Sequence, residues 1–458
     1  MLRRFQKNIL TNYIQSRSYY NLLRLKSRGV FQEVFPHEAE GKIQAELGKS
    51  EQTIYAGFDP TSDSLHVGNL LVIIGLLHAQ RGQHRTIALI GGATGKIGDP
   101  SGRSKERNLL ENNVIDHNLK SISIQIKKIF DNHREYFWEK QNQKKEELKE
   151  LLIVNNADWY SDISFIDFIS KVGRHFRLGQ MLSRASVRSR LESEEGMSFT
   201  EFTYQVFQAY DWLQLFQKYN CRYQMGGLDQ MGNLMTGCEF ITRVLKKQAY
   251  GITLPIITNE EGNKFGKSAG NAVWLDANKT SEFGFYQFFL RQPDTEAEKL
   301  FKLFSLLRTN EVFDQIDKHK RAPELRGLQI ALADQLTLLI HGEKGLEKAK
   351  KISNALYNGD VHALGSMNKN EVQEVFSGAP YKELILEPGM TILNIGMRVG
   401  CFKHENDAKR IISAGGFYIN MKRSNNPSEI LTPNVHILPN DITLIRVGKR
   451  NFYIIKWV

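Results

Sequence analysis

Residues 53–69 constrain the fold of this 458-residue chain more than any other stretch. The run from Thr53 to Phe58 is β-branched and aromatic, which predicts a buried strand. A polar turn opens at Asp59, and the residues that follow are apolar enough for a helix, with Asp63 or Ser64 expected to cap its first turn. The stretch therefore predicts a strand that passes through a turn directly into a helix.

A turn of this kind predicts a phosphate site, because backbone N–H groups and the positive end of the helix dipole converge at a helix N-terminus. His66 adds a side-chain donor there, and Gly68 has no Cβ, so a base or ribose can approach the backbone closely. The tetrapeptide His66-Val67-Gly68-Asn69 resembles the HIGH motif of class I aminoacyl-tRNA synthetases. Its position between a strand and a helix strengthens the resemblance.

The net charge of +11 is concentrated near the N-terminus. Residues 1–32 hold seven Arg and Lys residues and no Asp or Glu, and without them 54 basic and 50 acidic residues remain. An Arg-rich leader that contains Ser and Asn and lacks acids is typical of a mitochondrial transit peptide, and a disordered basic tail is the alternative. We expect a transit peptide over residues 1–30, with processing near Arg28, and a mature protein in the mitochondrial matrix.

Two classes of protein are disfavoured by composition. No stretch approaches the ~20 consecutive apolar residues that a membrane-spanning helix requires. The three cysteines, Cys221, Cys238 and Cys401, lie far apart without C-x-x-C spacing, which predicts neither a disulfide framework nor a zinc site. We therefore expect no membrane partner and no metal ligands in the chain.

A second buried strand is predicted over residues 85–92, and it ends in a glycine-rich turn. The following segment is not a P-loop, because Ile90 stands where the first glycine is needed and Ile97 where Ser or Thr is needed. Asp99 lies between a glycine and a proline, which favours a fixed carboxylate over a simple Asx-turn acid.

Polar residues next mark a helix and two loops. Tyr204, Gln208 and Asp211 share one face of a predicted helix beside an aromatic stripe, which suggests a small polar ligand. A predicted strand over residues 223–227 leads into a Gly-Leu-Asp-Gln turn, and residues 264–268 read Lys-Phe-Gly-Lys-Ser. Strands alternate with helices throughout this region, so the fold class is α/β with a Rossmann-like, largely parallel sheet.

We expect three parts after the leader. Residues 31–291 form the α/β domain, residues 292–387 a helical domain, and residues 388–458 a small α+β module. From residue 390 onward ten basic residues face four acidic ones, and residues 442–458 carry a β-hairpin pattern. A basic α+β module fits binding to a phosphate backbone, with a merely solvated face as the alternative.

Six motifs then occur in order: YxGFDPT, HVGN, GGATGKIGDPSGR, FTYQVFQAYD, GGLDQMGN and KFGKS. Together they resemble the tyrosyl-tRNA synthetases over essentially the whole chain after the leader, and the leader and the ending GKRNFYIIKW resemble the mitochondrial form. The resemblance implies a homodimer that activates L-tyrosine with ATP and Mg²⁺ and transfers the tyrosyl group to mitochondrial tRNA(Tyr). It implies no tightly bound cofactor, an anticodon-binding helical domain and a C-terminal RNA-binding module.

The resemblance also implies roles for individual residues. Tyr55 and Asp211 match residues that bind the substrate phenol, whereas the remaining tyrosine contacts match those at the amino and carboxylate groups: Asp99, Tyr204, Gln208 and Gln230. The phosphate-binding and catalytic set is Thr61, His66, Arg103, Arg107, Lys264 and Lys267. The ATP-binding set is Gly57, Asp59, His66, Gly68, Asn69, Gly227, Asp229 and Lys267.

Four positions depart from the family pattern. Asn69 stands where the fourth HIGH residue is often His, and we expect ATP binding to survive because Asn can donate a hydrogen bond. Ala56 replaces a frequent Cys, whereas Leu228 and Met231 change the usual GSDQxGN and put the shape of the ribose pocket in question.

Two alternatives stay open at this stage. The related tryptophanyl enzyme is disfavoured, because an indole N–H cannot use Tyr55 and Asp211 as a phenol does. A non-catalytic RNA-binding protein on the same scaffold, such as an intron-splicing factor, is disfavoured by the two lysines of KFGKS. A second role besides catalysis is not excluded by any residue.

Overall fold

The structure of the chain is a computed structural model that describes residues 21–103, 105–139, 147–258, 265–268, 271–358, 364–367, 372, 376, 379–448 and 451–458. It divides into two compact units: the described residues up to Thr280 with Phe289–Ile340, and Ser281–Phe288 with His341–Val458. The first boundary lies just before α10 (Glu282–Leu290), and the other two fall inside α10 and α13 (Gly327–Asn358). The division at residues 291 and 387 stays a prediction.

The first unit is built on a six-stranded sheet in the order β1-β6-β5-β2-β3-β4. The five strands from β6 to β4 run parallel, whereas β1 pairs antiparallel with β6 at the edge. This confirms the α/β fold class with a Rossmann-like sheet. The strands are β1 (Val34–Phe35), β2 (Thr53–Phe58), β3 (Arg85–Ile90), β4 (Leu151–Asn155), β5 (Cys221–Gly227) and β6 (Tyr250–Leu254).

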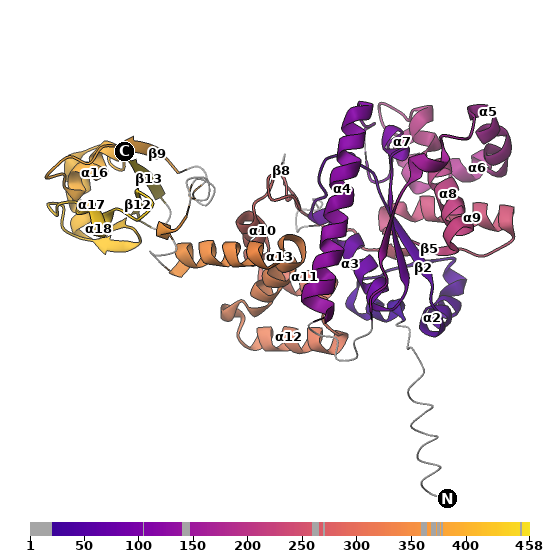
Figure 1. The fold of residues 1–458 in the computed structure, drawn as a ribbon, viewed down its shortest axis with the longest axis horizontal. Coiled ribbons are helices and arrows are strands. Elements are labelled where there is room, and N and C mark those ends of the chain that lie inside the picture. The colour runs from indigo at the N-terminus through magenta and orange to yellow at the C-terminus, as the bar shows by residue number, and fades with distance from the viewer. Residues whose placement is uncertain are drawn as a thin grey trace, which may run out of the picture. The chain divides into compact units, whose positions relative to one another are not determined.

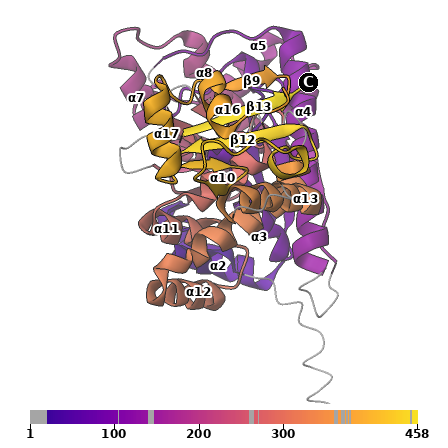
Figure 2. The same ribbon diagram turned by 90° about the vertical axis from the view of Figure 1, so that its left-hand side faces the viewer.

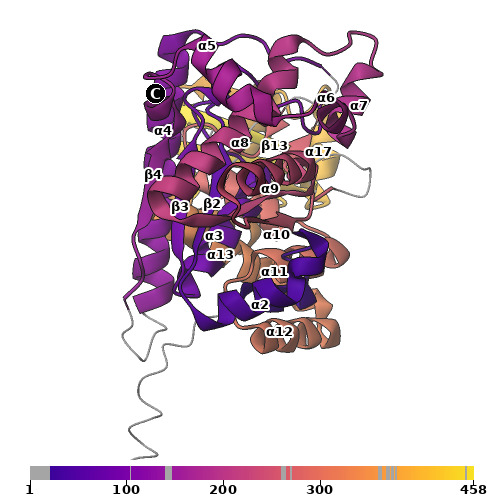
Figure 3. The same cartoon turned by 90° about the vertical axis from the view of Figure 1, so that its right-hand side faces the viewer.

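Helices cover both faces of this sheet (Figures 1 and 3). Helices α8 (Phe199–Tyr219) and α9 (Met231–Leu245) pack against each other on one face, and α3 (Val67–Arg81) lies on the other. Helix α4 (Asn112–Asn132) contacts β3 and β4. Right-handed crossovers require this arrangement, because the connections to β3 and β4 run across the sheet in the opposite direction from those to β5 and β6.

Shorter elements complete the first unit. Between β4 and β5 lie α5 (Phe165–Asp167), α6 (Leu178–Leu182) and α7 (Ala185–Leu191). No helix in the described part of the chain is long and apolar enough to cross a membrane. The other elements are η1 (Leu22–Arg28), η2 (His37–Ala39), α2 (Glu40–Lys49), η3 (Thr94–Lys96), η4 (His133–Glu139), η5 (Asn156–Trp159), η6 (Phe168–Val172), η7 (Gly173–His175), η8 (Leu228–Gln230), β7 (Lys267–Ser268), β8 (Asn271–Ala272), α11 (Asp294–Phe304), α12 (Thr309–Arg321) and η9 (Pro323–Leu325).

The second unit contains a five-stranded sheet in the order β11-β10-β12-β13-β9, which Figure 2 shows with α16 and α17 beside it. Apolar side chains of both helices pack on one face of the sheet, and β12 and β13 form the predicted hairpin. The elements are β9 (Tyr381–Leu384), α16 (Ile392–Val399), α17 (Glu405–Ser413), β10 (Phe417–Ile419), β11 (Lys422–Ser424), α18 (Pro433–His436), β12 (Ile442–Val447) and β13 (Asn451–Trp457).

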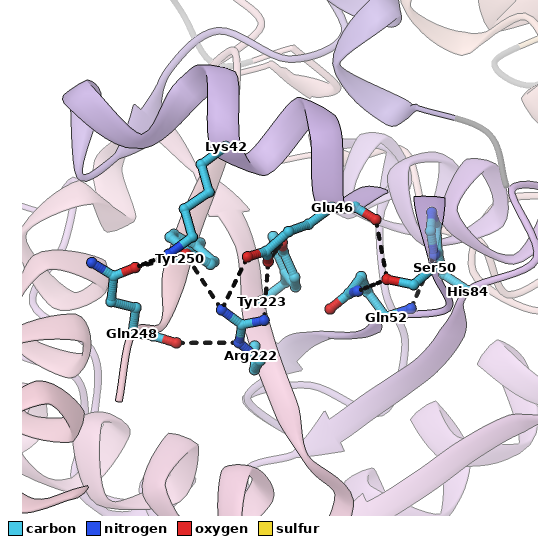
Figure 4. Close-up of polar contacts among 9 residues, drawn as sticks. All are labelled: Lys42, Glu46, Ser50, Gln52, His84, Arg222, Tyr223, Gln248 and Tyr250. Carbon is cyan, nitrogen blue, oxygen red and sulfur yellow. Dashed lines mark hydrogen bonds and ion pairs between the residues drawn. The ribbon is translucent and has the colours of Figure 1, made fainter. Parts of the chain in front are cut away.

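A polar network fixes α2 to the amino ends of β5 and β6 (Figure 4). Glu46 on α2 pairs with Arg222 at 3.0 Å and accepts a hydrogen bond from the Tyr223 hydroxyl at 2.8 Å. Arg222 also donates to the backbone carbonyl of Gln248. Because ligands of open α/β sheets bind at the carboxyl ends of the strands, this network has a structural role.

Residues 22–31 belong to the folded first unit, although the predicted leader extends to residue 30. Leu22, Leu25 and Val30 are almost completely buried. The Arg28 guanidinium donates to the backbone carbonyls of Lys302, Ser305 and Leu307, just past and within the last turn of α11, where a cation is favourable. Any processing that leaves this unit intact must therefore end before Asn21.

Two truncations test this boundary. Removal of residues 1–20 is expected to leave the melting temperature unchanged, whereas removal of residues 1–30 lowers it sharply. At about 1.5–3 kcal/mol for each buried aliphatic side chain, the longer truncation costs a large share of a typical domain stability of ~5–15 kcal/mol. Thermal unfolding of both proteins is the measurement, and equal melting temperatures would show that η1 does not support the fold.

Candidate active site

A cleft of about 970 Å³ opens in the first unit at the carboxyl ends of the parallel strands. Residues at the ends of β2, β3, β5 and β6 line it, as expected for a ligand site of an open α/β sheet. Many of the predicted site residues lie in this lining: Tyr55, Gly57, Asp59, Thr61, His66, Gly68, Asn69, Asp99, Arg103, Arg107, Tyr204, Gln208, Asp211, Gly227, Asp229 and Gln230.

The turn after β2 is closed by a capping box at the start of α3. His66 is the N-cap, and its Nδ1 accepts a hydrogen bond from Gly68 N at 3.0 Å, while Asn69 Oδ1 accepts from His66 N at 3.1 Å. The expectation that Asp63 or Ser64 caps this helix is wrong, because both lie before the N-cap position. Since Nδ1 is an acceptor here, a neutral His66 ring carries its proton on Nε2, which is a donor.

Gly68 is required by the same cap. A Cβ on Gly68 would lie 2.7 Å from Cε1 of His66, which is far inside van der Waals contact. Close approach of a ligand is the predicted reason for a glycine at this position. The contact with the His66 ring is a second reason, and it lies inside the protein. Asn69 uses its side-chain oxygen for the capping box, so its amide nitrogen remains the group that can donate to a ligand.

The KFGKS loop meets the start of α3, although the two motifs lie about 200 residues apart in the sequence. Gly266 accepts a hydrogen bond from Val273 N at 2.9 Å, and Val273 in turn accepts one from Val67 N at 2.9 Å. Gly266 has a φ of 76°, and a Cβ there would lie 3.2 Å from the Val67 side chain. Lys264 lies outside the described residues, and Lys267 is placed by its backbone, in β7.

Tyr55 and Asp211 lie near each other at the buried end of the site. Both are almost completely buried, at 1% and 2% exposure, and the Tyr55 hydroxyl makes no hydrogen bond to another described residue. Burial, together with the nearby Asp211 charge, holds the pKa of Tyr55 well above its ordinary value. Burial also raises the pKa of Asp211 to about 7, against three hydrogen bonds that lower it.

Those three bonds come from the segment that follows β4. Asn156 Nδ2 donates to Asp211 Oδ2 at 2.9 Å, and Oδ1 accepts from Trp159 Nε1 at 2.9 Å and from the Tyr160 hydroxyl at 2.7 Å. The backbone N–H of Ala93 donates to Asn156 Oδ1 at 2.7 Å, which fixes the orientation of the Asn156 amide. Asp211 therefore sits in a set of neutral donors.

A second carboxylate, Asp59, lies half-buried at the end of β2. It accepts hydrogen bonds from the Thr94 and Tyr204 hydroxyls, both at 2.8 Å. Burial raises the pKa of Asp59 to about 6, and these two bonds oppose the shift. Asn156 also donates to Thr94 Oγ1 at 3.0 Å, so one amide links the surroundings of Asp59 and Asp211.

A third acid, Asp99, is joined to the turn that follows β5. The Gln230 side-chain amide donates to Asp99 Oδ2, and Ser101 N donates to Oδ1 at 2.9 Å. Burial raises the pKa of Asp99. Asn233 donates to Gln208 Oε1 at 2.9 Å and to Gln230 Oε1 at 3.2 Å, so these polar groups hold one another in place.

The wider part of the cleft carries the arginines. Partial loss of water lowers the pKa of Arg103, whose side chain is exposed, while the Nε atom of Arg107 is buried without a partner among the described residues. Thr61 lies in the same lining, and its backbone N–H donates to the Asp59 carbonyl at 2.8 Å. In the described part of the chain no group of three or more His, Cys, Asp or Glu residues is placed to hold a metal ion.

Comparison with known proteins identifies the family. Residues 48–358 match the family model for tRNA synthetases class I (W and Y). The chain belongs to this family. It is 57% identical to a mitochondrial tyrosine–tRNA ligase of Drosophila melanogaster, over 98% of this chain and 97% of the relative. It is 45% identical to the mitochondrial tyrosine–tRNA ligase of Homo sapiens, over 94% of this chain and 91% of the relative.

Solved structures agree with this assignment of the chain to the synthetase family. The truncated mitochondrial tyrosyl-tRNA synthetase of Aspergillus nidulans matches with a TM-score of 0.66 and 31% identity, over 76% of this chain and 96% of that structure. That of Coccidioides posadasii matches with a TM-score of 0.63 and 31% identity, over 76% and 98%. The resemblance to the tyrosyl-tRNA synthetases is thereby confirmed, whereas the roles of individual residues stay predictions.

The residues that hold the predicted site residues in place were not predicted from the sequence of the synthetase. Asn156, Trp159 and Tyr160 bind Asp211, Thr94 binds Asp59, and Asn233 binds Gln208. A signal was present in the order Leu-Leu-Ile-Val-Asn-Asn, an apolar run that ends in polar residues and forms β4. Polar residues at the carboxyl end of a parallel strand are candidates for a site.

Gly57 of the synthetase provides a test of the ATP side of the cleft. A Cβ there would meet no atom within 4 Å, so Gly57→Ala should leave the melting temperature and tyrosine affinity unchanged. We expect KM for ATP to rise about tenfold, because the methyl group occupies space that the nucleotide needs. Steady-state pyrophosphate exchange measures this, and Gly41→Ala on α2 is the matched control, since its Cβ also meets no atom. An unchanged KM would remove Gly57 from the ATP site.

Proposed function

We propose that the buried end of the cleft recognises tyrosine by its phenol, in a chain that is a tyrosine–tRNA ligase of the mitochondrial form. The pairing of Asp211 with Tyr55 carries this proposal. An ionised Asp211 can only accept hydrogen bonds, whereas the Tyr55 hydroxyl can donate one. A phenolic hydroxyl both donates and accepts, so it satisfies both buried groups at once.

The same pair rejects the closest competitors. Phenylalanine would leave the Tyr55 hydroxyl buried without a partner and the open acceptor position of Asp211 unfilled, and an unpaired buried polar group costs about 1–3 kcal/mol. Tryptophan offers an N–H donor to Asp211 but no acceptor for the Tyr55 hydroxyl. This distinction matters because the matching family model covers synthetases for both tryptophan and tyrosine.

The polar groups beside the phenol site would hold the α-amino and carboxylate groups. We assign Asp99, Tyr204 and Gln208 to the ammonium group and place Gln230 near the carboxylate. The carboxyl group of Asp99 supports this assignment, since its loss of water raises its pKa and an ammonium group would favour the ionised form. Asp59 lies between this region and the nucleotide.

The first chemical step needs no nucleophile from the protein. A carboxylate oxygen of tyrosine forms a bond to the α-phosphorus of ATP, the bond from that phosphorus to the bridging oxygen breaks, and pyrophosphate leaves with its Mg²⁺. Catalysis then rests on positioning and on stabilising the charge of the leaving group. In the second step a hydroxyl of the terminal ribose of tRNA attacks the tyrosyl carbonyl, and AMP leaves.

We assign stabilisation of the negative charge on the pyrophosphate leaving group to the two motifs that meet at the start of α3. His66 would donate from Nε2, and Thr61 lines the same cleft. Four cationic side chains would stabilise the rest of this negative charge, as the family resemblance implies: Arg103, Arg107, Lys264 and Lys267. Gly57, Gly68, Asn69, Gly227 and Asp229 would contact the adenosine, where small residues allow close approach.

We propose that the second unit contacts tRNA through its basic surface. Lys403, Lys422 and Arg423 are exposed, and the segment from residue 390 carries six more basic than acidic residues. Positive charge of this kind favours a phosphate backbone. The helices between residues 292 and 387 are assigned to anticodon binding by the family resemblance alone.

Amino-acid selectivity tests the assignment directly. In ATP–pyrophosphate exchange with the protein lacking residues 1–20, tyrosine should support strong exchange and phenylalanine and tryptophan almost none. Asp211→Ala should abolish exchange with tyrosine, because the phenol loses its acceptor, and circular dichroism would check that the variant is folded. Near-normal exchange by this variant would contradict the site, and exchange with tryptophan would contradict the substrate.

A homodimer is supported by exposed apolar side chains between β4 and the start of α8. They come from one continuous segment, and burying them against a second copy would remove them from water. Phe165→Asp should therefore convert a dimer into a monomer in sedimentation velocity, whereas Leu325→Asp, an equally exposed site on η9, should not. A Phe165→Asp protein that stays dimeric would contradict this interface. The exposed side chains are Phe165, Ile166, Ile169, Leu178, Leu182, Leu191 and Phe199.

A further inference from the structure

Tyr160 lies outside the six sequence motifs, yet it contributes to this site. It follows η5, and its ring packs against Phe207 and Tyr210, with ring centres 5.4 and 5.6 Å apart. Its hydroxyl lies 2.7 Å from Asp211 Oδ1 and 3.0 Å from the Phe207 carbonyl oxygen. One hydroxyl hydrogen can serve only one of these acceptors, and the shorter contact to a charged acceptor is the stronger.

The hydrogen-bond capacity of Asp211 shows what this contact does. Each carboxylate oxygen accepts about two hydrogen bonds. Oδ1 already accepts from Trp159 and Tyr160, and Oδ2 accepts from Asn156. One position on Oδ2 is then left for a ligand. Loss of the Tyr160 donor would open a second position, on the other oxygen, and release the carboxylate from its fixed orientation.

We propose that Tyr160 is a positioning residue for tyrosine recognition, whose hydroxyl fixes Asp211 so that its one open acceptor position meets the substrate phenol. This inference rests on the proposed roles of Tyr55 and Asp211. Tyr160 acts through Asp211 and is not assigned a contact with the substrate.

The charge on Asp211 depends on the same contact. The titratable groups that face it from β2, from the turns after β2 and η5, and from α8 are Tyr55, Asp59, Tyr160, Tyr204 and Tyr210, and none of these is a cation. Neutral donors must therefore stabilise the carboxylate. Because a donor favours the ionised form, removal of the Tyr160 hydroxyl raises the pKa of Asp211 further.

Tyr160→Phe tests the proposal, because it keeps the ring and removes the hydroxyl. In pyrophosphate exchange we expect kcat/KM for tyrosine to fall about tenfold, the size expected for a hydrogen bond to a charged group. KM for ATP and kcat/KM for phenylalanine should stay unchanged, so that discrimination between the two amino acids narrows. The acid limb of kcat/KM against pH, expected near pH 7 in the unmodified protein, should move to higher pH.

Tyr210→Phe is the matched control, since its ring packs in the same cluster and no hydrogen bond joins its hydroxyl to another described residue. It should behave as the unmodified protein does. A Tyr160→Phe protein with unchanged tyrosine kinetics and an unchanged acid limb would overturn the proposal, as would an equal loss for tyrosine and phenylalanine, which indicates damaged packing. Failure of the unmodified protein to activate tyrosine would instead contradict the proposed function itself.

Discussion

The active site depends on a carboxylate, Asp211, that is held inside the protein without a cationic partner among the residues that the structure describes. Burying an ionised group in this way is costly unless hydrogen bonds replace the lost water. Asn156, Trp159 and Tyr160 supply three such bonds, yet the pKa of Asp211 is still raised to about 7. The protein therefore compensates the charge in part and leaves one acceptor position, which a substrate hydroxyl can fill.

The fold separates two kinds of chemistry along one cleft. At its buried end, Tyr55 and Asp211 lie among aromatic side chains, where each hydrogen bond is strong and each unpaired group is costly. Elsewhere in the cleft, the start of α3 offers hydrogen-bond donors, and Arg103 and Arg107 line the cleft with positive charge. Selection of the amino acid and stabilisation of the leaving group are thus assigned to different residues that one parallel sheet brings together.

Much of this arrangement could be predicted from the sequence. The strand at residues 53–58, the helix after it and the C-terminal hairpin have strong local patterns, and most of the site residues predicted from the six ordered motifs line one cleft. The predictions failed or fell short where local pattern and tertiary contacts disagree. His66 caps α3 instead of Asp63 or Ser64, because His66 still has an extended backbone and the helix begins only at Val67.

Other features could not be read from the sequence for physical reasons. Asn156 and Tyr160 become site residues only because β4 pairs with β3 and brings their segment under α8. Similarly, Arg28 looks like one more basic residue of a leader until its contacts with the carbonyls at the end of α11 are known. In both cases the deciding contact joins segments far apart in the chain.

A double-mutant cycle tests the central claim most directly. Calorimetry would measure the affinities of tyrosine and phenylalanine for the unmodified protein and for Tyr55→Phe. If the Tyr55 hydroxyl pairs with the substrate phenol, removing either hydroxyl removes the hydrogen bond between them, and the cycle gives a coupling free energy of about 1 kcal/mol or more. Additive effects of the two changes would contradict the claim that this buried pair reads the phenol.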